Sequence, residues 1–436
     1  MATDTERVAI VGAGPAGLAA GAALRAAGIP FTIFERHTDV GGLWDLDNPG
    51  TPVYETAHFI SSRTLSAFDG FPFPDDYPDY PSQRQILAYL RAYADHHELR
   101  PHIRFSSGVR RTTPAPDGEW TIELADGSIE TAGWLVAASG HLWDPNLPDY
   151  PGEFHGEAYH SVDYRSPDQF RGRRVLVVGA GNSGVDIACD AAVAADEAAI
   201  SLRRGYWFVP KHVFGVPADV FGHGGPTLPA AVERKVIGWL LRLTVGDLRR
   251  YGLPAPDHAP LSSHPILNTQ LLHYLGHGDV SAKPDIAELC GDKVRFADGT
   301  MASFDTIVWA TGYHPTVPFL EGGVPWRNGA PDLFLQLASR KGDGLYVMGM
   351  YETDGGAYPL LSLQGRVLAG EIALHRGDAH SATRLRALHA TSPDLRGGRR
   401  YLDTERHSKY VHGATYAKRL RAYAEALERG EVPVRL

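Results

Sequence analysis

The sequence predicts an α/β protein with two doubly wound, Rossmann-like dinucleotide-binding domains. Two glycine fingerprints carry this prediction: Gly12-Ala13-Gly14-Pro15-Ala16-Gly17 and Gly179-Ala180-Gly181-Asn182-Ser183-Gly184. Each follows a short apolar strand and runs into an alanine-rich helix. Such a turn lets the backbone approach a pyrophosphate, whose charge then lies at a helix N-terminus. Two fingerprints predict two bound dinucleotides, and a protein that binds two usually transfers a hydride between them.

Composition excludes several other classes. The apolar fraction of 43% is enough for a large core, and the net charge of −9 argues against nucleic acid or an anionic membrane surface as a partner. Cys189 and Cys290 are the only cysteines, which excludes a disulfide framework and favours a cytoplasmic location. No uninterrupted apolar run has transmembrane length, so we expect no membrane span.

The first fingerprint opens a β-α-β unit. A strand is expected at Val8–Val11, a helix up to Ala27 and a second strand at Phe31–Phe34. Glu35 closes that strand about 20 residues beyond the fingerprint, where a carboxylate accepts hydrogen bonds from the ribose hydroxyls of an adenosine. The Gly41-Gly42-Leu43-Trp44 segment allows a second close backbone approach to a phosphate or ring; the alternative is a plain turn with a core tryptophan.

The region after this unit predicts a helix and a set of short strands. Prolines mark a loop over 69–81, and Ser82 caps a helix that extends to about His97. Strands are expected at 103–105, 109–112, 120–124 and 134–137, with a hairpin turn at Asp126-Gly127. Antiparallel strands inserted after a β-α-β unit are typical of large flavin-binding folds. The first dinucleotide is therefore expected to be FAD.

The second fingerprint opens a similar unit with a different end. Its second strand, Ala199–Leu202, is followed by Arg203 and Arg204 and not by a carboxylate. Guanidinium groups match a ribose 2′-phosphate, so the second dinucleotide is expected to be NADPH; the alternative is that both arginines simply face water. Residues 205–282 form an insertion with a helical stretch near 230–243. His273 and His277 lie one helical turn apart without a supporting carboxylate or cysteine pair, so no metal is assigned.

Three further motifs resemble those of flavin-containing monooxygenases, the class B flavoprotein monooxygenases. Residues 154–164 match F-x-G-x-x-x-H-[ST]-x-x-[YF], and Asp305 to Tyr313 match D-x(4)-A-T-G-Y. Residues 136–141 look like an earlier counterpart of the second motif. Together with the fingerprints, the resemblance runs from about Arg7 to Leu374, and the chain looks like a soluble, bacterial-type member.

The resemblance implies that the NADPH domain is inserted into a split FAD domain. Residues 1–165 would form the first part of the FAD domain, 166–310 the NADPH domain, and 311–436 the second part with C-terminal helices. The FAD-binding residues would be Gly12, Gly14, Pro15, Ala16, Gly17, Glu35, Arg36, Gly42, Leu43, Trp44, His58, Val109, Ser139, Gly140 and Gln364. The NADPH-binding residues would be Gly179, Gly181, Asn182, Ser183, Gly184, Arg203, Arg204, Thr311, Gly312 and Tyr313.

The resemblance also implies the chemistry. NADPH would reduce FAD, O₂ would form a flavin C4a-hydroperoxide, and a nitrogen or sulfur atom of a small molecule would take one oxygen. Many family members place an asparagine beside the flavin in a segment like F-x-N-S-S-K. Here that segment carries Ile60, followed by Ser61 and Ser62. We interpret these three as the flavin-face residues. Either Ser61, Ser62 or His58 supplies the polar group that Ile60 lacks, or the oxygenating intermediate is less controlled.

Two other functions stay open. A Baeyer–Villiger monooxygenase would convert a ketone to an ester or lactone, although Tyr164 stands where such enzymes typically carry tryptophan. A protein that binds FAD and NADPH with weak turnover is the alternative of another class, and Ile60 is its support. The expected partners are a small-molecule substrate and O₂, with no nucleic acid and no membrane. A homodimer is left open.

Overall fold

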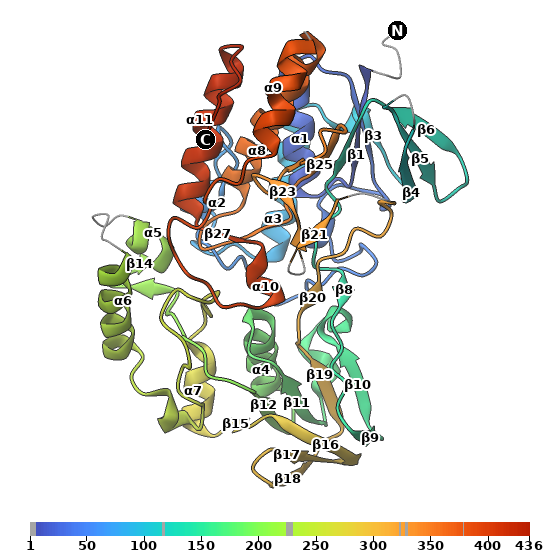
Figure 1. The fold of residues 1–436 in the computed structure, drawn as a ribbon. Coiled ribbons are helices and arrows are strands. Elements are labelled where there is room, and N and C mark those ends of the chain that lie inside the picture. The colour runs from blue at the N-terminus through green and yellow to red at the C-terminus, as the bar shows by residue number, and fades with distance from the viewer. Residues whose placement is uncertain (1–5, 116–117, 224–229, 322–323, 328–329, 378) are drawn as a thin grey trace. The chain divides into compact units, whose positions relative to one another are not determined.

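The computed structural model describes residues 6–115, 118–223, 230–321, 324–327, 330–377 and 379–436 (Figure 1). The chain folds into two compact units. The first comprises Met1–Pro49, Arg63–His141 and Pro315–Leu436, and the second comprises Gly50–Ser62 and Leu142–His314. The second unit is thus inserted into a split first unit. Its boundaries differ from the predicted 165/166 boundary, because it begins at Leu142 and also takes the separate segment Gly50–Ser62.

The first unit is built on a seven-stranded sheet with the order β23-β24-β25-β7-β1-β2-β3. Its parallel strands are β1 (Val8–Val11), β2 (Phe31–Phe34), β3 (Ile103–Arg104), β7 (Trp134–Ala137) and β25 (Leu345–Val347). Antiparallel β23 (Leu333–Phe334) and β24 (Ala338–Ser339) complete one edge. The strand order reverses between β1 and β7, and sheets of this kind bind nucleotides at such a reversal.

Helices gather around α8 in this unit. They are α1 (Pro15–Ala26), α3 (Gln83–His96), α8 (Tyr358–Gly377), α9 (Ala379–His389) and α11 (Gly413–Glu428). Figure 1 shows α9 and α11 standing beside α8, and α8 packs on α1. The Ser82 capping box starts α3 at the predicted position. The predicted strand–helix pattern of this unit is therefore confirmed.

A three-stranded antiparallel sheet also packs on the first unit's core. It consists of β4 (Val109–Pro114), β5 (Trp120–Leu124) and β6 (Ile129–Ala132), and Gly127 makes the β5–β6 turn at φ +84°. Trp120, Ile122 and Leu124 alternate inward along β5. They share one apolar core with Ala9 and Leu135 of the parallel sheet.

The second unit contains a five-stranded sheet with the order β10-β19-β11-β12-β15. All its strands are parallel: β10 (Glu157–His160), β11 (Arg174–Val178), β12 (Glu197–Ser201), β15 (Val280–Lys283) and β19 (Thr306–Trp309). Helices α4 (Asn182–Ala194) and α7 (Gln270–His277) pack together beside it. A second small sheet joins β9 (Gly152–Phe154), β16 (Ile286–Gly291), β17 (Lys293–Phe296) and β18 (Met301–Ser303). Both predicted dinucleotide folds are present, so the predicted fold class is confirmed.

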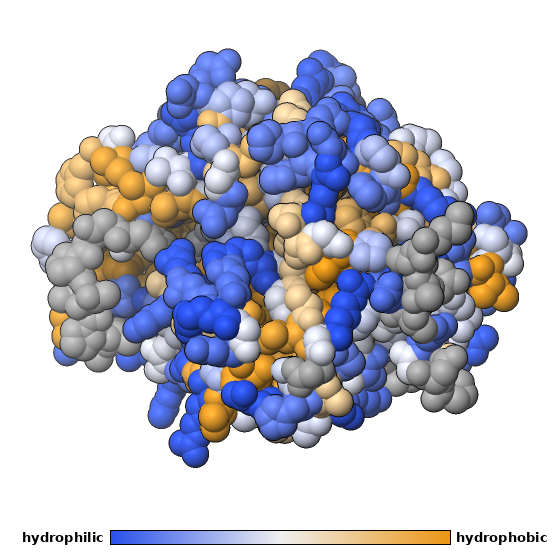
Figure 2. Space-filling model, turned by 90° about the horizontal axis from the view of Figure 1, so that it is seen from above, coloured by the Kyte–Doolittle hydropathy of each residue, from blue (hydrophilic) through white to orange (hydrophobic). Residues whose placement is uncertain are grey.

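The insertion ends earlier than the predicted residue 282, because β15 pairs with β12 in the main sheet. Its elements are β13 (His212–Val213), β14 (Val216–Pro217), α5 (Ala218–His223), α6 (Ala230–Thr244) and α7. One face of α6 exposes Val232, Val236, Trp239 and Leu243. Figure 2 shows a face on which hydrophilic side chains are interspersed with apolar groups at the left, in the centre and at the lower edge of the view. The insertion therefore carries the exposed apolar helix face of this unit.

Candidate functional site

The first glycine fingerprint forms a tight turn between β1 and α1. Gly12 has φ +105°, and a Cβ on it would lie 2.7 Å from the carbonyl oxygen of Ala138. A Cβ on Gly17 would lie 1.9 Å from the carbonyl oxygen of Gly12. Gly14 is the N-cap residue of α1, and Pro15 follows it. Backbone packing therefore requires glycine at Gly12 and Gly17, and the turn leaves a helix N-terminus open to an anion.

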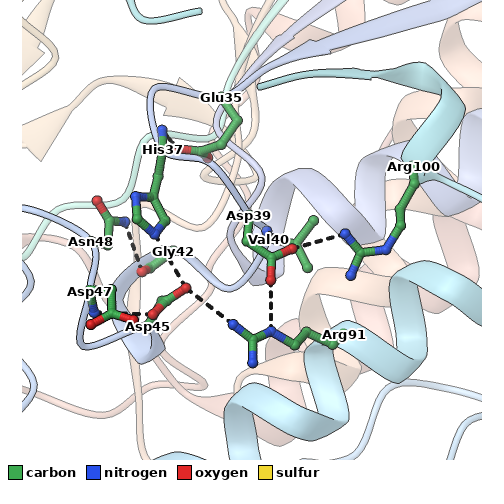
Figure 3. A network of polar contacts seen from close by, with 10 residues as sticks. All are labelled: Glu35, His37, Asp39, Val40, Gly42, Asp45, Asp47, Asn48, Arg91 and Arg100. Carbon is green, nitrogen blue, oxygen red and sulfur yellow. Dashed lines mark hydrogen bonds and ion pairs between the residues drawn. The ribbon is translucent and has the colours of Figure 1, made fainter. Parts of the chain in front are cut away.

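Glu35 is buried and lies beside His37 (Figure 3). Its Oε2 accepts a hydrogen bond of 2.6 Å from the amide of Ala13, inside the fingerprint. Its Oε1 accepts one of 2.8 Å from the amide of His37. Each carboxylate oxygen has a further lone pair with which to accept a ribose hydroxyl. The residue thus both fixes the turn and presents the acceptors that an adenosine ribose needs.

The Gly41-Gly42 turn packs directly on the fingerprint. The amide of Gly41 donates to the carbonyl oxygen of Ala13 at 3.1 Å. A Cβ on Gly42 would lie 2.8 Å from the Cα of Gly14. Asn48 Nδ2 donates to the carbonyl oxygen of Gly42 at 2.9 Å (Figure 3). The two glycine turns therefore form one backbone cradle, with Leu43 and Trp44 half-buried in the short helix that follows.

A charged network below this cradle was not predicted from the sequence. Asp39 accepts hydrogen bonds from Arg91 Nε at 2.8 Å and Arg100 Nη1 at 2.9 Å (Figure 3). Asp45 lies 3.3 Å from His37 Nε2 and 3.5 Å from Arg91 Nη2. These contacts tie the 35–48 loop to Arg91 on α3 and to Arg100 just beyond α3, and so stabilise the cradle. Nothing in the local sequence pattern signals them, because both arginines are distant from the loop in sequence.

The other residues predicted for FAD have varied environments. Ser139 follows β7, and its Oγ is buried without a hydrogen-bond partner among the described residues. Gly140 is left-handed at φ +76°. The exposed Arg36 donates to the carbonyl oxygen of Pro49 at 3.1 Å, and Val109 begins β4. The Ser139 hydroxyl and the backbone amides of the glycine cradle both fit a bound dinucleotide, because both offer hydrogen-bonding groups that a ligand can use.

Gln364 lies on α8 and is fully buried. Its Oε1 accepts from the amide of Gly349 at 3.2 Å. Its Nε2 donates to the carbonyl oxygen of Gln336 at 3.0 Å and to the hydroxyl of Tyr416 at 2.8 Å. Protein groups thus occupy both ends of this amide, which fixes the backbone at Gly349. A direct contact from Gln364 to FAD stays a prediction.

The second fingerprint repeats the first turn between β11 and α4. Gly179 has φ +108°, and a Cβ on it would lie 2.5 Å from the carbonyl oxygen of Ala310. A Cβ on Gly184 would lie 2.2 Å from the carbonyl oxygen of Gly179. Gly181 is the N-cap residue of α4, and Asn182 Oδ1 accepts from the amide of Leu267 at 3.1 Å. This cradle fits a second pyrophosphate for the same reasons as the first.

Arg203 and Arg204 follow the end of β12 but differ in their surroundings. Arg203 is exposed. Arg204 Nη2 donates to Asp257 at 3.0 Å, and its guanidinium lies 5.8 Å from the ring centre of Tyr206. Its Nε is buried without a partner among the described residues. The guanidinium groups of both arginines suit a 2′-phosphate, and Arg203 is the more exposed of the two.

The two family-like motifs of the second unit meet at His160. Its Nδ1 accepts from the amide of Val162 at 3.1 Å, so its Nε2 carries the proton and donates to the carbonyl oxygen of Gly312 at 3.0 Å. Burial lowers the pKa of His160, which favours this neutral form. The ring of Tyr313 packs edge-on against it at 4.9 Å, and Thr311 Oγ1 donates to the carbonyl oxygen of Asn146. The 154–164 motif therefore holds the 311–313 turn.

The expected flavin-face segment belongs to the second unit. His58 and Ile60 are exposed, and Ser61 is half-buried. Ser62 is buried, its amide donates to Asp219 Oδ2 at 2.7 Å, and its Oγ has no partner among the described residues. The segment thus has exposed positions at 58 and 60 and an anchored end at 62.

Neither a metal cluster nor a membrane span is found in the part of the chain that the structure describes. No group of three or more His, Cys, Asp or Glu side chains among those residues has the geometry to hold a metal ion. The ring centres of His273 and His277 lie 4.1 Å apart with the rings tilted by 48°, and His277 Nδ1 donates to the carbonyl oxygen of His273. No helix among the described residues combines the length and the apolar character needed to cross a bilayer.

Comparison with known proteins identifies relatives. Residues 5–375 match the family model described as flavin-binding monooxygenase-like. The chain is 33% identical over 337 residues to indole-3-pyruvate monooxygenase YUCCA1 of Oryza sativa subsp. japonica, which covers 74% of this chain and 79% of the relative. It is 34% identical over 387 residues to flavin-containing monooxygenase 3 of Homo sapiens, and this alignment covers 83% of this chain and 72% of the relative.

A solved structure of OTEMO in complex with FAD and NADP has a similar fold. The TM-score is 0.75 at 19% identity, with 97% of each chain covered. The family match spans both glycine cradles and the motif that holds the 311–313 turn. This chain therefore belongs to the flavin-binding monooxygenase-like family, and it is a flavin-dependent monooxygenase that uses FAD and NADPH.

Proposed function

We propose that this enzyme oxygenates a soft nitrogen or sulfur atom of a small molecule. FAD held in the first cradle and NADPH held in the second would together supply the reduction and the activation of O₂, with one oxygen atom going to the substrate and the other, with two protons, to water. The observation that carries the proposal is the pair of cradles, each with its own selectivity residue. Glu35 closes the first cradle with acceptors for a ribose, and Arg203 and Arg204 close the second with donors for a phosphate.

The chain's own residues bind and orient. The backbone amides of the two fingerprints hold the pyrophosphates at the N-termini of α1 and α4. Glu35 holds the adenosine ribose of FAD, and Arg203 and Arg204 hold the 2′-phosphate of NADPH. His160 keeps the 311–313 turn in place through its bond to Gly312. No side-chain nucleophile is needed for this reaction.

Tyr164 supports heteroatom oxygenation over ester formation. It ends the 154–164 motif where Baeyer–Villiger enzymes typically carry tryptophan. Its hydroxyl donates to Asp190 Oδ2 at 2.8 Å. A tryptophan at this position would offer an indole N–H in place of the phenol hydroxyl that makes this contact.

Product analysis tests the proposal. The purified holoenzyme is given NADPH and air with methyl phenyl sulfide, N,N-dimethylaniline or cyclohexanone in separate reactions. Sulfoxide or N-oxide formed in step with NADPH consumption supports the proposal. Caprolactone without heteroatom products would make the enzyme a Baeyer–Villiger monooxygenase. Hydrogen peroxide as the sole product in every reaction would favour a nucleotide-binding protein with weak turnover.

Location and assembly complete the proposal. Cys189 is buried, Cys290 is half-buried, and both are free thiols, which suits a reducing cytoplasm. A homodimer is tested by light scattering of the holoenzyme, where twice the 47.4 kDa chain mass would support it.

A further inference from the structure

Two carboxylates on α4 contact the separate segment Gly50–Ser62. Asp186 and Asp190 lie one helical turn apart, so both face the same side of the helix. Asp186 Oδ2 accepts from the hydroxyl of Tyr54 at 3.4 Å. Asp190 Oδ2 accepts from Thr56 Oγ1 at 2.5 Å. The helix that begins at the second fingerprint thus holds the beginning of this segment.

Each carboxylate also contacts a second part of the unit. Asp186 Oδ1 accepts from Asn268 Nδ2 at 2.7 Å, and Asn268 Oδ1 in turn accepts from the amide of Leu271 at the start of α7. Asp190 Oδ2 accepts from Tyr164 at the end of the 154–164 motif. The hydrogen-bond donors around the pair therefore come from three chain regions. Two of them, at Asn268 and Tyr164, hold the carboxylates independently of the segment.

Two backbone contacts complete the attachment of the segment. The amide of Glu55 donates to the carbonyl oxygen of Arg165 at 2.9 Å. The amide of Ser62 donates to Asp219 Oδ2. Between these attachments the side chains of His58 and Ile60 remain exposed. The segment is thus anchored at both ends and presents the residues between them.

The chain continuity makes this attachment informative. The segment directly follows the Gly41-Gly42 cradle in sequence, and Arg63 after it returns to the first unit. Yet its anchors lie on α4, at Arg165 and at Asp219, all in the second unit. The placement of Ile60 and Ser61 is therefore set by the unit that carries the NADPH fingerprint.

We propose that Asp186 and Asp190 are positioning residues, which hold the flavin-face segment on the NADPH-binding unit through Tyr54 and Thr56. This inference rests on the proposed function for the role of Ile60 and Ser61. Loosening the segment should separate NADPH consumption from oxygen transfer, because the residues that protect the reaction would no longer be held in place. Binding of NADPH itself should change little, since its cradle does not include the segment.

Thr56 offers the sharpest test, because it is exposed and its replacement leaves the core intact. Thr56→Val keeps the shape and removes the hydroxyl, whereas Thr56→Ser keeps the hydroxyl. Amide exchange in a peptide covering 50–62 is followed by mass spectrometry on the intact holoenzyme. We expect exchange roughly tenfold faster in Thr56→Val and Asp190→Asn, from the loss of the hydrogen bond between Thr56 and Asp190. Thr56→Ser and the control Asp168→Asn, an exposed aspartate, should match the wild type.

The second readout is the hydrogen peroxide released per NADPH consumed. It should rise several-fold in Thr56→Val while the KM for NADPH stays within about twofold, and Thr56→Ser should restore coupling. Unchanged exchange and unchanged coupling in both Thr56→Val and Asp190→Asn would overturn the inference. A wild type that does not oxidise NADPH would refute the proposed function instead, and the exchange measurement would still decide whether the two aspartates anchor the segment.

Discussion

The Glu35 carboxylate accepts a hydrogen bond of 2.6 Å from the amide of Ala13, and this bond joins the residue after β2 to the first fingerprint. The same carboxylate also accepts a hydrogen bond from the amide of His37. The residue expected to bind a ribose therefore also supports the turn that is expected to bind the pyrophosphate. Changes at Glu35 should affect both at once.

We predict that Glu35→Gln weakens FAD binding at least tenfold. The NH₂ group of the glutamine would face the backbone N–H of either Ala13 or His37, which would then lack its acceptor. A buried donor without an acceptor costs about 1–3 kcal/mol of free energy. Reconstitution of the apoenzyme with FAD, followed by flavin fluorescence, measures the Kd. Glu123→Gln, on the small antiparallel sheet, is the matched control. Equal affinity in Glu35→Gln would show that this carboxylate does not contribute to binding.

The two arginines after β12 should differ in their effects. Arg203→Ala should lower kcat/KM for NADPH, because one charge-assisted phosphate contact is lost, which corresponds to about 1.5–3 kcal/mol of transition-state stabilisation. The kcat/KM for NADH should stay nearly unchanged. Arg204→Ala should also disturb Asp257, its partner at 3.0 Å, and so affect both coenzymes to some extent. Steady-state kinetics with each coenzyme separates these effects, with Arg171→Ala as control. A parallel loss for NADPH and NADH in Arg203→Ala would contradict the 2′-phosphate role.

Ile60→Asn should improve coupling. Ile60 is 36% exposed, so the substitution removes little buried apolar surface and should not unfold the protein. The added amide supplies the polar group that many family members carry at this place. We expect the peroxide released per NADPH to fall by about threefold, on the scale of one net hydrogen bond. A coupled peroxidase assay measures it, and Ile60→Val, which adds no polar group, should behave like the wild type. An unchanged ratio in Ile60→Asn would indicate that the side chain does not reach the flavin.

Asp305 should make folding depend on pH. Its side chain accepts two hydrogen bonds from the Arg174 guanidinium and one from the Arg174 amide, and these lower its pKa from 3.8 to about 2. A carboxyl whose pKa falls on folding stabilises the protein above its unfolded pKa. That contribution is lost as the pH drops from about 4 to about 2.

Urea unfolding between pH 2 and pH 6 tests this, because Asp305→Asn should flatten the loss of stability toward low pH. The difference should shrink in high salt, since the pair is partly exposed. Asp292→Asn, in the same unit, is the control. A pH profile of Asp305→Asn identical to that of the wild type would exclude a contribution from this pair.

The contact between Asp305 and Arg174 gives a structural reason for the aspartate of the family-like motif. Asp305 begins the D-x(4)-A-T-G-Y pattern, yet it lies at the start of β19 and binds the first residue of β11. Its place in the pattern reflects the assembly of the parallel sheet. The residues at the other end of β19, Thr311 to Tyr313, are the ones that the cofactor prediction concerns.

The sequence by itself determined the features that depend on short stretches of chain. The glycine spacing, the apolar strands and the Ser82 cap act within one turn or one strand, so their physics is local and readable. The FAD and NADPH cradles and the two-sheet fold were predicted on that basis.

Only the tertiary structure decided which distant groups meet. It assigned Gly50–Ser62 to the second unit, satisfied both ends of the Gln364 amide, and gave Asp186 and Asp190 their partners. It also distinguished Arg203 from Arg204 through Asp257. These outcomes depend on contacts between residues that are far apart in the chain, and a hydrogen bond or an ion pair leaves no periodic pattern in either of the segments that it joins.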